Sequence, residues 1–343
     1  MLGVARIYWT VFEAPFGTHA ADVRNVLVVV GIVTALLGAV MAFLQRHLKR
    51  LLAYSTISHA GVMLVGVALL DHVSLAGVAN LVLSHGLLKG ALFLAAGVLL
   101  REFSSVDELR LHGRGRELPV LGALFALGAF GLIGFPYVGS FLGHALIDDG
   151  AAELGHSWLP PVLMVASGVS SAAIVRAGAR IFLGWGPKRD PLLAPEPDED
   201  PPAGKGSGPL MLATIAALVA AGIVASVVPG LQDGAEHAAA HFQDREAYVS
   251  HVLDGKRVDV LPEIPLVVHR ATNASIGYGL GAAALTFAVA AIGLWRRRVP
   301  RAFEVPLNGL KAAHTGVVGD YVMWLTVGTA VLGGIWLLTL TSG

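Results

Sequence analysis

Residues 77–97 read GVANLVLSHGLLKGALFLAAG, an apolar run with two ionisable side chains near its middle. A membrane-spanning helix needs about 20 mostly apolar residues, and this run meets that requirement. His85 and Lys89 are four residues apart, so they share one face of the helix. An ionisable group at mid-span costs about 2.5–3.5 kcal/mol on insertion scales, so both side chains require a specific role.

The composition of the whole chain is that of a polytopic membrane protein. Of its 343 residues, 55% are hydrophobic and 14% are charged, against about 25% charged in ordinary globular proteins. This composition excludes a disordered chain, a nucleic-acid-binding protein and an ordinary cytosolic enzyme. Because the chain has no cysteine, disulfides, cysteine-ligated metal sites and thiol catalysis are excluded as well.

Eight stretches are long and apolar enough to cross a membrane, and they lack the strict alternation of barrel strands. Small residues at helical spacing, such as Gly31 and Gly38, would let neighbouring helices approach closely. We therefore expect an all-α polytopic membrane protein with about eight transmembrane helices. The candidate spans cover residues 26–44, 53–70, 75–100, 119–147, 161–183, 209–228, 276–294 and 317–340.

The charges between the spans predict how the chain is oriented. Basic residues gather in the first, third, fifth and seventh connections, whereas the fourth connection is acidic, with Asp148, Asp149 and Glu153. Short cytoplasmic loops carry an excess of Lys and Arg. Both termini are therefore expected to face outward from a bacterial plasma membrane.

His85 and Lys89 favour a buried proton relay. A lysine removed from water can exchange its proton near neutral pH, and histidine titrates in the same range. The alternative is a structural hydrogen bond from these side chains to a neighbouring helix.

The stretch 119–147 is too long for one simple crossing and carries Pro136 among several glycines, so we expect a broken helix. Broken helices at membrane depth commonly line ion sites, because their freed backbone groups must meet polar partners or water. His144 follows the break by two turns. An ion path is favoured over a plain proline kink with a core histidine.

Two further pairs have one-turn spacing. Ser55 and His59 could hold a water chain or tie two helices together. Arg176 and Arg180 lie near the inner end of a span. There, snorkelling to the cytoplasmic interface is favoured over contact with a partner subunit or an inner-side water path.

Two apparent motifs are discounted, and we expect neither a cofactor nor a metal. Residues 277–282 fit GxGxxA, but no strand precedes them and a span follows. Glu236, His237 and His241 have metal-ligand residue types at helical spacing. Their order is not HExxH, and their amphipathic segment favours a solvated or interfacial outer helix.

Three segments, taken in this order and spacing, resemble the antiporter-like proton-conducting membrane subunits. They are KRLLAYSTISHAG at 49–61, LSHGLLKGALFLAAG at 83–97 and GFPYVGSFLGHALID at 134–148. This family includes the L, M and N subunits of respiratory complex I, the large membrane subunits of hydrogenase-linked complexes, and the A and D subunits of Mrp sodium/proton antiporters. The resemblance covers residues 1–185 well and the remainder weakly.

The resemblance implies a fold of two inverted five-helix repeats, each with one discontinuous helix. In the second repeat, protons pass along a central lysine, a histidine of the same helix, and a lysine or glutamate of the broken helix. Lys89 matches the central lysine and His85 the histidine, while His144 stands where many members have the broken-helix lysine. Leu81 stands where some members have a further histidine.

The chain resembles the C-terminal half of such a subunit. We expect a partial helix and outer segment at 1–24, a five-helix repeat with the proton path at 25–185, and an inner acidic, proline-rich linker at 186–208. Three accessory transmembrane helices are expected at 209–343, with an outer loop at 229–275.

The resemblance implies a non-catalytic subunit that moves protons in a redox-driven complex or an Mrp-type cation/proton antiporter. Lys89 would be the central carrier, His85 the relay, His144 the release site and His59 a water-path residue. The supporting residues would be Ser55, Ser84, Pro136 and Arg176.

The expected partners are other membrane subunits, such as those of an NADH:quinone oxidoreductase or hydrogenase-type complex. The lipid bilayer and protons or Na⁺ are expected as well, but not nucleic acid. The alternatives are a structural membrane scaffold and half of a split secondary transporter.

Overall fold

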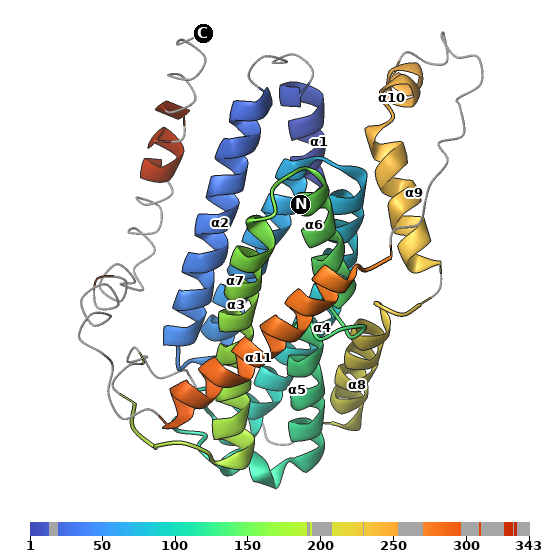
Figure 1. The fold of residues 1–343 in the computed structure, drawn as a ribbon. Coiled ribbons are helices and arrows are strands. Elements are labelled where there is room, and N and C mark those ends of the chain that lie inside the picture. The colour runs from blue at the N-terminus through green and yellow to red at the C-terminus, as the bar shows by residue number, and fades with distance from the viewer. Residues whose placement is uncertain are drawn as a thin grey trace.

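The computed structural model of the chain describes residues 1–13, 20–190, 193, 208–228, 230–252, 270–295, 309, 326–331 and 333–334. Within these residues the regular secondary structure is helical, apart from one isolated bridge between His47 and Asp107. The predicted all-α fold is therefore confirmed (Figure 1).

Five helices of the described residues are long and apolar enough to cross a membrane. They are α2 (Ala20–Leu44), α3 (Leu48–Leu69), α4 (His72–Phe103), α7 (Leu159–Gly178) with its π-helical continuation η4 (Ala179–Leu183), and α11 (Asn273–Trp295). Helices α2, α3, α4 and α7 pack side by side into the central bundle (Figure 1). Shorter helices flank them, including α1 (Leu2–Ile7), η1 (Tyr8–Glu13) and η3 (Arg114–Glu117).

The fourth predicted span is interrupted, as the sequence predicts. Helix α5 (Pro119–Leu132) ends at mid-span, and α6 (Phe141–Glu153) continues after an irregular segment. Gly139 in this break has a φ of 59°, and a Cβ atom there would lie 2.1 Å from the carbonyl oxygen of Gly131. Only glycine fits this turn. The same carbonyl accepts hydrogen bonds from the backbone N–H and the hydroxyl of Ser140.

Local signals set the ends of the helix that carries His85 and Lys89. Asp71 caps the start of α4, because its carboxylate accepts hydrogen bonds from the backbone N–H and the hydroxyl of Ser74. Ser104 adopts a left-handed conformation with a φ of 51° and ends the helix. Helix α4 therefore runs unbroken, with the two ionisable side chains near its middle.

Small residues allow α2 and α3 to approach closely. A Cβ atom on Gly61 would lie 2.4 Å from the backbone nitrogen of Ala35, and one on Gly38 would lie 2.6 Å from that of Ser58. At Gly31 the added atom would lie 2.7 Å from the side chain of Val65. The close approach predicted at Gly31 and Gly38 is thus confirmed.

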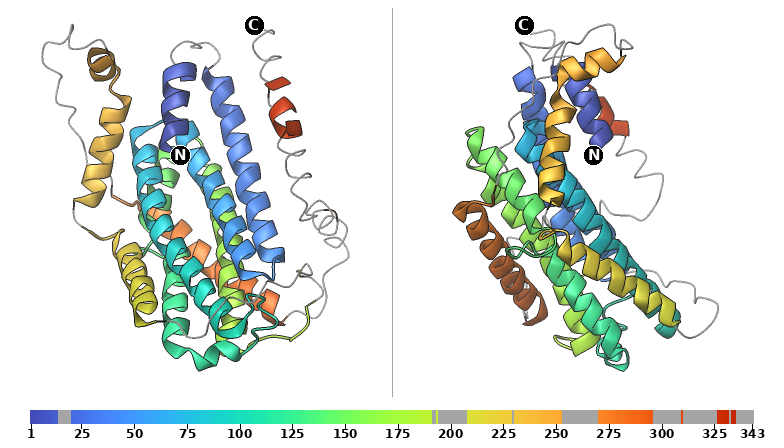
Figure 2. Two further views of the ribbon diagram at one scale, coloured as in Figure 1. Left: turned by 180° about the vertical axis from the view of Figure 1, so that it is seen from behind. Right: turned by 90° about the vertical axis from the view of Figure 1, so that its right-hand side faces the viewer.

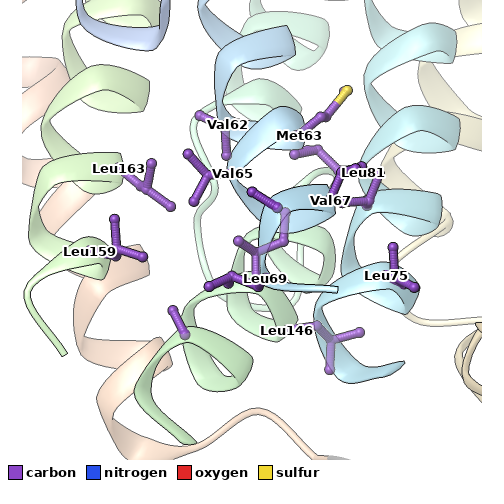
Figure 3. Packing of buried hydrophobic residues seen from close by; sticks show 14 of the residues in the cluster. Val62, Met63, Val65, Val67, Leu69, Leu75, Leu81, Leu146, Leu159 and Leu163 are labelled. Atoms are coloured by element: carbon purple, nitrogen blue, oxygen red, sulfur yellow. The ribbon is translucent and has the colours of Figure 1, made fainter. Parts of the chain in front are cut away.

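Aliphatic side chains fill the bundle at the end opposite the basic loops. Figure 3 shows Val65 of α3 near Leu163 of α7 and Met63 of α3 near Leu81 of α4, and all four are buried. Leu146 of α6 belongs to the same cluster. This packing holds α3, α4, α6 and α7 around the polar site described below.

The C-terminal part differs from the predicted spans. Helix α8 (Pro209–Val224) has 16 residues and is shorter than a full crossing. The predicted outer loop contains α9 (Leu231–Gln243), which packs against α4, and α10 (Arg245–Val252). Helix α11 crosses obliquely over α6 and α7 (Figure 2). Most of the predicted span 317–340 and of the predicted linker 186–208 lies outside the described residues.

Asp148 and Asp149 lie within α6, so the acidic connection predicted from the charge pattern is wrong for both. Their exposed fractions are 7% and 4%. The helix continues past them to Glu153, and Asp149 accepts hydrogen bonds from Thr272, just before α11, that satisfy its carboxylate inside the protein.

Candidate functional site

Lys89 lies where three helices meet. Its exposed fraction is 4%, and its Nζ donates hydrogen bonds to Oγ of Ser55 at 2.6 Å and to the carbonyl oxygen of Leu52 at 3.2 Å. The hydroxyl of Ser170 donates in turn to Oγ of Ser55 at 2.9 Å. A chain of hydrogen bonds thus joins α4, α3 and α7 around the buried amine.

Three histidines from three helices meet beside this chain. The ring centroid of His59 on α3 lies 4.5 Å from that of His85 on α4 and 5.7 Å from that of His144 on α6. His59 and His85 are buried, while His144 is partly buried with its Nε2 shielded from solvent. The helix break therefore brings His144 to the pair formed by α3 and α4.

A hydrogen bond of His59 determines which of its nitrogens can take up a proton. Nδ1 lies 2.9 Å from the carbonyl oxygen of Ser55, and a carbonyl only accepts, so Nδ1 donates. The neutral ring then has its lone pair on Nε2, which has no hydrogen-bond partner among the described residues. Both ring nitrogens of His85 and Nε2 of His144 also lack partners there. The cluster therefore offers several nitrogens that can accept protons.

These four groups are coupled through their charges. Within the described residues, neither Lys89 nor any of the three histidines forms an ion pair with a carboxylate. Like charges repel strongly at short range in a poorly hydrated interior. A proton on one group therefore disfavours a proton on the next, which suits a path along which one proton moves at a time.

The supporting residues predicted from the sequence occupy different places. Ser55 is at the centre, bonded to both Lys89 and Ser170. The hydroxyl of Ser84 donates to the carbonyl oxygen of Asn80, so its proton is engaged within α4. Pro136 is half-buried in the helix break.

Arg176 is buried in an ion-pair network, so the predicted snorkelling is wrong. Arg176 and Arg180 have no exposed surface, and both pair with the carboxylate of Glu108. Arg176 also donates to the carbonyl oxygens of Phe43 and Gln45. Burial raises the pKa of the Glu108 carboxyl above its usual range, and the two arginine charges act against this shift. The terminal nitrogens of both guanidinium groups find their partners inside the protein, so neither side chain reaches the interface.

Glu108, Asp190 and Ser170 were not predicted from the sequence. Asp190 accepts a hydrogen bond from Arg180 at 2.6 Å and extends the network. Two arginines one turn apart within a span indicate that carboxylates lie nearby, because buried charges are normally paired. The spacing gives no indication of which acidic residues supply them, and Ser170 resembles any small residue of a packed helix.

The discounted motifs have local structural explanations. Residues 277–282 lie inside α11. Glu236 accepts a hydrogen bond from Gln232 and is buried in α9, which packs against α4. The sequence predicts a solvated or interfacial outer helix for this segment, and solvation is wrong for this side chain. His237 and His241 are exposed.

The fold and the site define a polytopic α-helical membrane protein with a lysine and three histidines along its core, beside a broken helix. The chain belongs to the NADH:quinone oxidoreductase/Mrp antiporter transmembrane family, whose model matches residues 1–174. The matched segment contains Lys89 and the whole histidine cluster.

Two individual relatives match a shorter segment than the family model does. The chain is 37% identical over 132 residues to NAD(P)H-quinone oxidoreductase chain 4 1 of Synechococcus elongatus, covering 38% of this chain and 25% of the relative. It is 31% identical over 152 residues to NADH-quinone oxidoreductase subunit M of Pseudomonas aeruginosa, covering 44% of this chain and 29% of the relative. The match thus spans between a quarter and a third of these relatives.

Two solved structures share the fold. A chain of the Mrp complex from Dietzia superposes with a TM-score of 0.61 at 23% identity, covering 74% of this chain and 52% of that one. A chain of respiratory complex I from Thermus thermophilus with bound NADH gives a TM-score of 0.56 at 24% identity, covering 70% and 49%. Both likenesses show the arrangement of the helices.

Proposed function

We propose that the chain conducts protons as an antiporter-like membrane subunit of a redox-driven complex or of an Mrp-type cation/proton antiporter. The observation that carries the proposal is the hydrogen bond from buried Lys89 to Ser55, beside three histidines that meet at the helix break. The family and the names of its relatives support this class of function.

Lys89 is the central carrier in this path. When the amine gives up its proton, the hydroxyl of Ser55 and the carbonyl of Leu52 remain as polar neighbours of its nitrogen. His85, one turn away on α4, exchanges protons with the amine. The ring contacts of His59 then connect His85 to His144 at the break.

The partners are other membrane subunits, and the coupling to them is electrostatic. In a poorly hydrated site a nearby charge acts more strongly than it does in water. A charge that appears in a neighbouring subunit therefore changes the proton affinity of Lys89 and moves its proton. The chain itself needs no cofactor for this step.

The basic end of the bundle faces the cytoplasm of a bacterial plasma membrane. Arg46 follows α2, Arg101 lies in the last turn of α4, and Arg116 precedes α5, so basic residues mark one end of three helices. By the positive-inside rule this end is cytoplasmic and the N-terminal residues lie outside. Helix α6 then leads from the break towards the outer face.

A structural scaffold is the second candidate, because the hydrogen bonds of Lys89 also tie α4 to α3. The two functions differ in what they require of the amine. A scaffold needs only its hydrogen bonds, whereas a proton path needs its titration.

The testing experiment measures proton pumping by the complex that is purified through this chain and reconstituted in liposomes. Lys89→Ala is expected to abolish pumping in normally assembled complex. Ser58→Ala is the control, because Ser58 is buried on α3, which packs against Lys89, but its hydroxyl donates to the carbonyl of Ala35 at 2.8 Å. Unchanged pumping by assembled Lys89→Ala would refute the proposed path.

A further inference from the structure

Two adjacent aspartates on α6 have different surroundings. Asp149 accepts hydrogen bonds from the hydroxyl of Thr272 at 2.7 Å and from its backbone N–H at 3.3 Å, which anchors the start of α11. Asp148 is 7% exposed, and its Oδ1 has no hydrogen-bond partner among the described residues. The hydrogen bonds of Asp149 therefore give it a structural role, whereas no such bond explains why Asp148 is buried.

A small cavity connects Asp148 to His144. It has a volume of about 20 Å³ and lies where α6, α7 and α11 meet. Its polar lining includes His144, Asp148, Ser167, Ser275 and Tyr278. A cavity needs roughly 10–15 Å³ of such volume to hold a water molecule, so this one has room for a single water.

The residues that line this cavity have unused hydrogen-bonding capacity. Nε2 of His144, Oδ1 of Asp148 and Oγ of Ser167 are shielded from solvent and have no partner within the described residues. Buried polar groups are normally paired, so three such atoms around one cavity need an explanation. One water molecule bonded to all three would satisfy them and connect the imidazole to the carboxylate.

Asp148 also lies on the way from the break to the surface. His144 and Asp148 are four residues apart on α6, so their side chains share a face, with Cβ atoms about 5–6 Å apart. Ser275 lines the cavity together with Asp148 and donates its hydroxyl to the carbonyl oxygen of Thr272, which is an exposed residue. A path from His144 through Asp148 therefore ends at an exposed site beside the start of α11.

Helix α11 supplies one wall of this path, although it lies beyond the residues matched by the family model. A Cβ atom on Gly279 would lie 2.8 Å from the carbonyl oxygen of Gly134, so the helix sits directly against the break. Ser275 and Tyr278 extend from the same helix into the lining. The accessory helix thus forms one side of the cavity.

Resting on the proposed function, we infer that Asp148 carries protons between His144 and the surface at the start of α11. The protonated imidazole gives up the proton of its Nε2–H bond to a water molecule in the cavity, and that water gives one of its own protons to the carboxylate. His144 and Asp148 both end neutral, and no oxidant, reductant or other co-reactant is needed. Asp148 then releases the proton to solvent beside Thr272.

The test compares Asp148→Asn with Asp149→Asn in the purified complex, reconstituted in liposomes without sodium and normalised to assembled complex. Pumping is expected to fall about tenfold or more in Asp148→Asn, which corresponds to at least 1.4 kcal/mol in the barrier. Pumping is expected to persist in Asp149→Asn, because the amide oxygen can still accept a hydrogen bond from Thr272. It is also expected to persist in Asp148→Glu, which keeps a carboxylate at this position. An infrared difference spectrum of turnover is expected to contain a carboxyl band that shifts in Asp148→Glu.

The outcomes separate this inference from the proposed function. Full pumping by Asp148→Asn, with Lys89→Ala inactive, overturns the role of Asp148 and leaves the proposed function standing. Full pumping by Lys89→Ala overturns the proposed function and the role of Asp148 with it. The inference is also overturned if the unaltered complex pumps only when Na⁺ is added and Asp148→Asn pumps without it. That result would show that the cavity binds sodium. If Asp148→Asn does not assemble, an unshifted carboxyl band in Asp148→Glu overturns the inference.

Discussion

The Nζ atom of Lys89 on α4 lies 2.6 Å from the Oγ atom of Ser55 on α3 and donates a hydrogen bond to it. The backbone carbonyl of the same serine accepts from Nδ1 of His59, and its hydroxyl oxygen accepts from Ser170. Ser55 is therefore the point at which the amine and the histidine cluster meet. Its hydroxyl holds the amine, and its carbonyl fixes the protonation site of the histidine.

Ser55→Ala is expected to slow proton pumping about tenfold while the complex still assembles. The substitution removes one hydrogen-bond acceptor of Lys89 but leaves the other, the carbonyl of Leu52, in place. The amine therefore stays in its site but is held less precisely. Pumping by the reconstituted complex measures this effect. Ser58→Ala removes a neighbouring buried hydroxyl and should pump normally, so equal losses in the two variants would contradict the role given to Ser55.

His59→Asn is expected to reduce pumping about tenfold or more, because the amide can donate to the carbonyl of Ser55 but cannot take up a proton. The measurement is the ratio of pumped protons to turnovers of the driving reaction. Ser84→Ala serves as control, since among the described residues the hydroxyl of Ser84 is bonded only to backbone carbonyls of α4. A normal ratio in His59→Asn would remove this histidine from the path.

Glu108→Gln is expected to destabilise the protein strongly without a direct effect on the path. Removing one partner of a buried ion pair costs about 3–5 kcal/mol, because the remaining charges stay buried and uncompensated. Here Arg176 and Arg180 would both lose their shared carboxylate. Thermal unfolding of the purified protein in detergent measures the loss.

Asp107→Asn is the comparison for Glu108→Gln, because the Arg46 partner of Asp107 is 23% exposed in its side chain and is better solvated. A smaller loss of stability is expected there. An equal shift of the unfolding temperature in both variants would show that burial of the Glu108 network adds nothing.

Much of the path could be predicted from local pattern. The four-residue spacing puts His85 and Lys89 on one helical face, and the proline and glycines of the stretch 119–147 indicate the break before His144. Both are properties of single segments, and such properties can be derived from spacing alone. The roles of these residues in proton transfer remain predictions.

The contacts between segments could not be predicted. Ser170 reaches Ser55 across 115 positions of the chain, and Thr272 reaches Asp149 across 123. Neither partner has a distinctive spacing of its own. For the same reason the charge pattern placed Asp149 in a loop: its hydrogen-bond donor, Thr272, lies far along the chain, just before α11.

The most direct measurement is proton pumping by Lys89→Arg in the assembled complex. A guanidinium group keeps the positive charge and can donate to Ser55 and Leu52, but it does not lose its proton in proteins. Abolished pumping in normally assembled complex is the result expected of a proton carrier. Normal pumping by Lys89→Arg would contradict the account, because it would show that only the charge and hydrogen bonds of this residue are required.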